Sequence, residues 1–179
     1  MAKLDKTDVL AGWMAIPDEL KRVSSGLTSK ALDARTGPDK MSTRETVHHL
    51  VEANLIASNI VISALANSGS AFDWTWVNPG GTWMSRMGYS KAPIGPAIST
   101  LQALTRHFAA ILSVLEDGLQ RTVELYDSPG APHYKKTVRQ ILLDEVGHAR
   151  EHLSALPARP IRGRRRVTRR SGRERQGRV

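Results

Sequence analysis

Residues 68–95, SGSAFDWTWVNPGGTWMSRMGYSKAPIG, decide the fold of this chain. These 28 residues separate two long segments of helical periodicity and have little periodicity of their own. Short links make neighbouring helices antiparallel, whereas a connection of this length can return to the end where the first helix began. If it does return, the helices on either side of this crossover run parallel.

Four segments carry apolar residues at the spacing of a buried helix face. We predict helices at about 7–23, 42–67, 96–119 and 134–156. Pro17 lies inside the first helix, where it predicts a kink or a division into two pieces. Ser42 and Glu45 form a capping box that begins the second helix. No segment alternates as a strand would, so we predict an all-α fold, a four-helix bundle with a long crossover between helices two and three.

The positive charge of the chain lies at its C-terminus. Residues 158–179 hold ten arginines and one glutamate, which accounts for the whole net charge of +9. We expect residues 1–157 to form the folded domain and residues 158–179 to be a disordered Arg-rich tail, because the tail has almost no apolar content. Nucleic acid or another anionic surface could bind this tail. No aromatic residue interleaves the arginines to stack on bases, so an extension without function stays open.

The composition excludes several classes of protein. The chain has no cysteine, which excludes disulfides, thiolate zinc sites and a cysteine nucleophile. No apolar run reaches the roughly 18 residues that a membrane span needs, and residues 1–6 lack the apolar core of a signal sequence. We therefore expect a soluble, cytoplasmic protein with no membrane partner.

A pair of histidines marks a candidate metal site. His148 and His152 are four residues apart in the fourth predicted helix, so both lie on one face, one turn apart. Two imidazoles in this relation can hold one ion from the same side, although the spacing alone arises easily by chance among six histidines. If the crossover returns, the start of the second helix lies beside this pair, and that start carries His48 and His49.

Only one of the two adjacent histidines can easily face the pair, because neighbouring residues on a helix point about 100° apart. We favour His49, since Glu45 and Glu52 lie four residues before and three residues after it on the same face. A ligand histidine needs a carboxylate or carbonyl to fix its tautomer. His48 stays the alternative. Two other histidines are expected away from this end of the bundle: His107 and His133.

Two stretches together resemble the DinB-like superfamily. They are residues 41–52, MSTRETVHHLVE, and residues 143–153, LDEVGHAREHL. Many relatives have tryptophan where this chain has Met41, and the resemblance covers about residues 7–156, without the tail. It implies a four-helix bundle with a long crossover and a divalent metal held by three histidines. Carried across, the implied ligands are His49, His148 and His152.

The resemblance implies the fold and the metal more firmly than the reaction. Members are similar to thiol S-transferases that use low-molecular-weight thiols, to maleylpyruvate isomerase-type enzymes and to metal-dependent hydrolases. The implied substrate is therefore a small molecule, and a homodimer is implied as well. Zinc is expected first, while nickel and iron(II) also suit imidazole. The ion would activate water or a thiol, with Glu52 or Glu45 as base or as support for a ligand. The alternative is a non-catalytic metal-binding or interaction bundle whose basic tail binds anions.

Two other metal motifs fit parts of the same sequence. His148, Glu151 and His152 match an inverted zinc-peptidase pattern, but that pattern needs a downstream acid and only Glu174 follows. Two Glu-x-x-His pairs, at 45–48 and 145–148, evoke a di-iron bundle, which needs a further acid near the start of helix three, where none occurs. A bundle without metal stays open.

The long crossover also carries aromatic residues that are candidates for the wall of a pocket. Trp74, Trp76 and Trp83 could line such a pocket, although packing of the crossover onto the bundle explains them equally well. Tyr126 and Asp127 are weaker candidates for the site.

Overall fold

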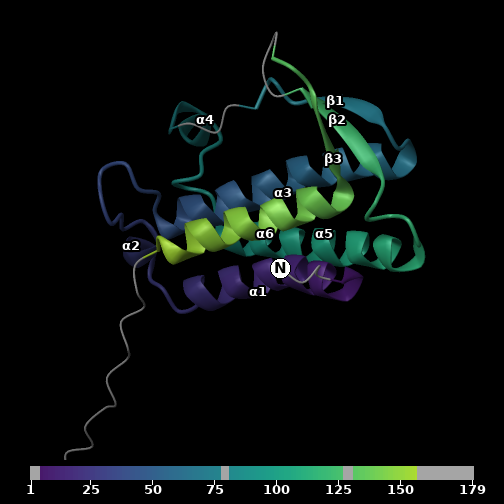
Figure 1. Cartoon of the computed structure of the whole chain (residues 1–179). Coiled ribbons are helices and arrows are strands. Elements are labelled where there is room, and N and C mark those ends of the chain that lie inside the picture. The colour runs from purple at the N-terminus through teal and green to yellow at the C-terminus, as the bar shows by residue number, and fades with distance from the viewer. Residues whose placement is uncertain (1–4, 78–80, 127–130, 157–179) are drawn as a thin grey trace, which may run out of the picture.

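The computed structural model describes residues 5–77, 81–126 and 131–156, and the predicted Arg-rich tail and Asp127 lie outside them. Four long helices pack side by side in a bundle, with a small sheet at one end (Figure 1). The helices of the bundle are α1 (Lys6–Ser24), α3 (Thr43–Ala66), α5 (Ile94–Val114) and α6 (Val138–Ser154). The predicted four-helix bundle is therefore confirmed.

Contacts at one end of the bundle show the direction in which each helix runs. Lys6, at the start of α1, donates to the Leu115 carbonyl just after α5, at 2.8 Å. The side chain of Arg121 donates to the Leu65 carbonyl near the end of α3. The backbone carbonyl of Arg121 accepts from the Val138 amide at the start of α6, at 2.9 Å. At this end α3 and α5 finish while α1 and α6 begin, so α3 and α5 are parallel and α6 opposes both, as the crossover predicted.

The core lies along the axis of the bundle, and each helix contributes one apolar face to it. Its largest fully buried side chains include Trp13, Leu20, Leu50, Leu101, Leu112 and Leu142. Helix α1 continues through Pro17 as one helix, so the predicted division there is wrong, while the predicted kink stays a prediction. Pro17 is buried in the core, and this packing offsets the backbone hydrogen bond that proline cannot make.

One polar contact crosses this core from α1 to α3. The indole N–H of Trp13 donates to the Asn54 side-chain oxygen at 2.6 Å, and both residues are fully buried. The Asn54 amide nitrogen in turn donates to the Leu50 carbonyl at 2.8 Å. A buried donor needs a partner because water cannot reach it, so this contact fixes how α1 and α3 face each other.

We expect Asn54→Ala to lower the free energy of unfolding by about 1–3 kcal/mol, because it leaves the Trp13 N–H buried without an acceptor. Chemical denaturation with urea measures this loss. Asn59→Ala is the matched control, because Asn59 also donates to a carbonyl four residues back in α3 but is exposed. The control should change stability by no more than about 0.5 kcal/mol. Equal losses of unfolding free energy in the two variants would show that the buried contact stabilises the protein no more than the exposed one.

A three-stranded sheet, which the sequence pattern did not predict, packs on α3 and α6 near one end of the bundle (Figure 1). Its strands are β1 (Ser70–Asp73), β2 (Thr122–Tyr126) and β3 (Tyr134–Thr137), in the order β1-β2-β3. Strand β1 pairs parallel with β2, with Ser70 opposite Val123, and β2 pairs antiparallel with β3. Because β3 takes residues 134–137, helix α6 begins at Val138, later than predicted. Likewise α5 ends at Val114, before the chain turns towards β2.

Two short helices occupy the connections: α2 (Ser29–Leu32) and α4 (Gly81–Arg86). The predicted start of the second long helix is confirmed. The Ser42 hydroxyl accepts from the Glu45 amide, and the Glu45 carboxylate accepts from the Ser42 amide at 2.9 Å. The two bonds satisfy backbone donors that the first turn of a helix leaves free. They set where α3 begins, and therefore where His49 lies.

Helix α3 is long and has a high mean hydropathy. By length and composition alone it could cross a membrane, with a mean hydropathy of 1.4 over its best window, half of which is buried inside the bundle. A helix at the centre of a bundle is apolar for the same reason, because much of its surface faces other helices. This property therefore has a sufficient explanation in the packing of α3.

Candidate metal centre

Three histidines from two helices meet at the end of the bundle opposite the sheet. His49, His148 and His152 each offer one ring nitrogen, and these three nitrogens all lie within 4.8 Å of one another. The Nε2 atoms of His49 and His148 are 3.1 Å apart. The structure therefore brings together the three residues that the sequence placed in one site.

The backbone explains why these rings converge. His148 and His152 are one turn apart on α6, and their ring centroids lie 4.7 Å from each other. His49 lies in the second turn of α3 and faces them, with its centroid 5.0 Å from that of His148 and 4.7 Å from that of His152. Because α3 and α6 run in opposite directions, the start of one lies beside the end of the other.

The surroundings of the cluster favour neutral rings. Burial, together with the neighbouring rings of His152 and His148, lowers the pKa of His49 from 6.5 to about 4. Burial and His148 also lower the pKa of His152, against a smaller opposing effect of Glu151. A neutral imidazole keeps the lone pair that binds a metal ion, whereas a protonated one cannot bind. At neutral pH, His49 and His152 are therefore in the form that a metal requires.

The other histidines lie elsewhere. His48 stacks on Tyr89 with ring centroids 5.5 Å apart, and its Nε2 lies 3.1 Å from the Ala92 carbonyl oxygen. His133 is exposed, lies 3.2 Å from Glu124 and stacks on Tyr126. His107 is exposed on α5. The preference for His49 over His48 therefore agrees with the geometry, and Tyr126 contacts His133 rather than the cluster.

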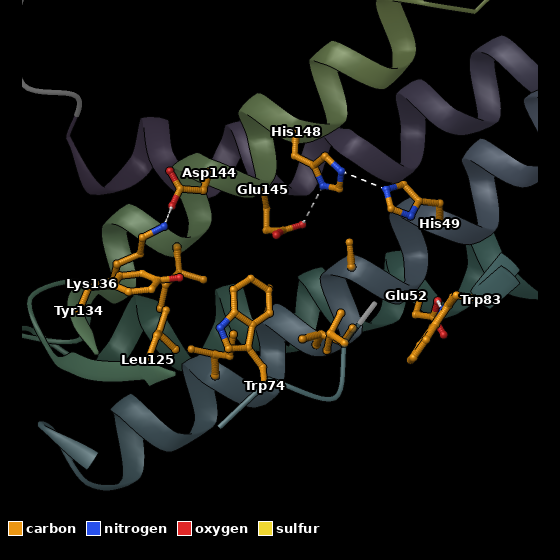
Figure 2. Close-up of a pocket in the computed structure, with 16 residues that line it drawn as sticks. His49, Glu52, Trp74, Trp83, Leu125, Tyr134, Lys136, Asp144, Glu145 and His148 are labelled. Atoms are coloured by element: carbon orange, nitrogen blue, oxygen red, sulfur yellow. Dashed lines mark hydrogen bonds and ion pairs between the residues drawn. The ribbon is translucent and has the colours of Figure 1, made fainter. Parts of the chain in front are cut away.

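A cavity of about 320 Å³ opens beside His49 and His148. Figure 2 shows these two rings at one end of it and Lys136, Tyr134 and Asp144 at the other. Trp74 and Trp83 from the crossover line it, whereas Trp76 is 59% exposed and packs on Trp83. The expected role of the crossover as a wall is thus fulfilled by two of its three tryptophans.

The two candidate acids from the sequence differ in position. Glu52 lines the cavity, and its Oε2 accepts from the indole N–H of Trp83 at 2.6 Å. Glu45 is buried, caps α3 and forms an ion pair with Arg35. It is not among the residues that line the cavity. Glu52 therefore lies at the cavity, whereas Glu45 makes structural contacts with the start of α3 and with Arg35. These contacts also disfavour a di-iron centre that would use Glu45 as a ligand.

The carboxylate that sequence reasoning missed as support for a ligand is Glu145. Its Oε2 lies 3.9 Å from Nδ1 of His148, the ring nitrogen that points away from His49 (Figure 2). That oxygen is buried and has no hydrogen-bond partner among the described residues. A small rotation would let the His148 N–H donate to it, which is the arrangement that fixes the tautomer of a metal-binding histidine. Its place three residues before His148 on α6 was the available sequence clue.

If Glu145 orients His148, Glu145→Ala should weaken metal binding by about tenfold, near the lower end of the range for such supporting residues. Glu145→Gln should recover part of the loss, because its amide oxygen can still accept a hydrogen bond. Competition with a chelating dye measures the affinity. Asp144→Asn is the control, since Asp144 is adjacent but pairs with Lys136. A loss as large in the control would show that Glu145 has no particular role.

No family model matches the chain, and no curated protein matches it. Among solved structures, the chain is similar to YfiT from Bacillus subtilis, which is described as "a probable metal-dependent hydrolase with an unusual four-helix bundle topology". The TM-score is 0.72, the sequence identity is 18%, and the match covers 87% of each chain. At this identity the match is evidence of a shared fold. The chain therefore has the YfiT-type four-helix bundle fold, in keeping with the DinB-like resemblance of its sequence.

Proposed function

We propose that this protein is a metal-dependent hydrolase of small molecules, in which His49, His148 and His152 hold one divalent ion. The observation that carries the proposal is the convergence of these three rings beside a cavity. Zinc binds imidazole nitrogen at about 2.0–2.1 Å, so two ligand nitrogens in a tetrahedral site lie about 3.3 Å apart. The separation of 3.1 Å between the His49 and His148 nitrogens fits that requirement.

Three protein ligands leave at least one position on the ion open, as in catalytic rather than structural zinc sites. When bound, the ion would supply a Lewis acid and would lower the pKa of a coordinated water towards about 7. Zinc is the first choice, and nickel and iron(II) are compatible with the same ligands. The description of YfiT as a probable hydrolase supports the choice of reaction.

Glu52 is the residue we assign to proton transfer in this site. It lies on the cavity wall, one turn along α3 from His49. The Trp83 indole holds one of its oxygens at 2.6 Å and thereby restrains the carboxylate. The other oxygen is then available to take a proton from a polar group in the cavity, which is the work of a general base. Glu145, beside His148, orients the ring rather than exchanging protons.

Metal analysis and a hydrolysis assay on the untagged full chain test the proposal. We expect about one divalent ion per chain, and metal-dependent cleavage of some members of a panel of esters and amides. Each reaction is run with and without a low-molecular-weight thiol. Turnover that appears only when a thiol is present would instead identify a thiol S-transferase. Metal binding without turnover of the panel, with or without the thiol, would favour the non-catalytic metal-binding bundle. The homodimer and the cytoplasmic location stay predictions from the sequence.

A further inference from the structure

We propose that the cavity beside the three histidines binds an uncharged, mainly apolar molecule that carries a hydrogen-bond acceptor oxygen, with the Trp74 indole N–H as its donor. This inference rests on the proposed function, because it names the class of substrate for the same site. It is carried by three properties of the described residues that line the cavity: apolar walls, a lysine that is already paired, and a buried donor without a partner.

The walls between the two ends of the cavity are apolar. They are built from Ala53, Ile56, Ala57, Ile60, Trp74, Val77, Leu125 and Ile141. These side chains come from α3, the crossover, β2 and α6, so the apolar surface surrounds the space on several sides (Figure 2). A ligand gains free energy here by removing apolar surface from water. The body of the ligand is therefore hydrocarbon.

Apart from any ion on the three histidines, the side-chain charges around the cavity disfavour an anionic ligand. Among the described residues, Lys136 is the one lysine or arginine in the lining, and its Nζ is paired with the Asp144 carboxylate at 2.6 Å. The remaining acids in the lining are Glu52 and Glu145. An anion placed against these walls would meet two carboxylates and no unpaired lysine or arginine, while losing its own hydration. An uncharged ligand avoids both penalties.

The polar group of the ligand follows from Trp74. Its Nε1 is buried in the cavity wall and donates to no acceptor among the described residues. An indole N–H is a donor only, and it is costly to bury unpaired. Because Trp74 lines the cavity, we infer that a small rotation of its ring would let a ligand oxygen accept from this N–H. A ketone, ester or amide carbonyl supplies such an oxygen without adding charge.

Three molecules of nearly identical shape separate these requirements: 4-phenylbutan-2-one, isopentylbenzene and 3-phenylpropanoate. They share a phenylethyl body and end in a carbonyl, two methyl groups or a carboxylate. Dissociation constants are measured by ligand-observed NMR on the full chain, both zinc-loaded and after chelation. The dissociation constants of the ketone and the carboxylate are compared in the metal-free protein, because a carboxylate could bind zinc directly. Trp74→Phe removes the donor, and Trp76→Phe is the control, since Trp76 is exposed and outside the lining.

We expect the ketone to bind at least about tenfold more tightly than the carboxylate in the chelated protein, as the charge argument requires. The ratio of the hydrocarbon constant to the ketone constant should fall about fivefold in Trp74→Phe, the value of one net hydrogen bond. It should not change in Trp76→Phe. Using the ratio cancels any change of packing that affects both ligands alike.

Tighter binding of the carboxylate, or an unchanged ratio in Trp74→Phe, would overturn the inference. The result is independent of the metal. If the ratio behaves as expected but the protein takes up no ion, the metal proposal fails and the ligand class stands. If the protein binds one ion but the ratio does not respond to Trp74→Phe, the ligand class fails and the metal proposal stands.

Discussion

In His148→Ala, the affinity for a divalent ion should fall by about a hundredfold or more. Structural zinc sites with four ligands contribute about 10–16 kcal/mol in total, so each ligand accounts for roughly 2.5–4 kcal/mol. At 1.4 kcal/mol per factor of ten, this corresponds to about two to three orders of magnitude. His49→Ala should show a loss of similar size. Competition with a chelating dye at fixed pH measures both affinities.

His48→Ala is the matched control for this loss, because His48 neighbours His49 but contacts Tyr89 and Ala92 instead of the cluster. We expect its affinity to stay within about threefold of the unmodified chain, because this substitution removes none of the three proposed ligands and a change of about 0.5 kcal/mol in binding free energy is less than threefold. Full metal retention in His49→Ala with loss in His48→Ala would reverse the assignment of the third ligand.

Without metal, the protein should lose stability as the pH falls from 6.5 to 4. The pKa of His49 is about 4 in the folded protein, against an ordinary value of 6.5. Over this range the unfolded chain binds a proton that the folded chain does not, so acid favours unfolding. A shift of this size corresponds to about 3 kcal/mol at the acid end. The lowered pKa of His152 acts in the same direction.

Urea unfolding at a series of pH values measures this dependence. In His49→Leu the contribution of His49 disappears, so the stability curve should be flatter between pH 4 and 6.5. Saturating zinc should raise stability most near neutral pH and less in acid, because protons compete with the ion for the three rings. If His49→Leu loses as much stability between pH 6.5 and 4 as the unmodified protein does, burial of His49 is not the cause of the acid sensitivity.

Local residues were enough to predict where the metal candidates lie along the bundle. Ser42 and Glu45 are three residues apart, so the capping box was visible in the sequence and the structure forms both of its bonds. The position of His49 follows from that start. The length of the crossover then indicated that α3 and α6 oppose each other, which brings His49 to the pair on α6.

The sheet could not be predicted from local pattern. Its strands have only four or five residues, and β1 pairs with β2, Ser70 with Val123, across more than fifty positions. Strand β3 reads YKKT and has no apolar alternation. Its pairing with β2 supplies the stability that its own sequence lacks. Such non-local pairing overrides the helical periodicity, which is why the fourth helix was predicted to begin too early.

The roles of the acids also depended on tertiary contacts. Glu45 and Glu52 were both assigned from their spacing to His49. In the structure Glu45 contacts Arg35 and caps α3, whereas Glu52 accepts from Trp83. Arg35 lies in the connection after α2, and Trp83 lies on α4. No periodicity rule places either of them. Glu145, in contrast, shares a helix with His148, so its position was predictable and only its role was misjudged.

Zinc X-ray absorption spectroscopy on the full chain tests the central claim most directly. After loading with zinc and removal of excess ion, we predict one zinc per chain with three imidazole nitrogens at about 2.0–2.1 Å and at least one oxygen ligand. The outer-shell scattering of three imidazole rings should be visible and should weaken in His148→Ala. An ion lost during removal of the excess, or a first shell made of oxygen alone, would contradict the three-histidine centre.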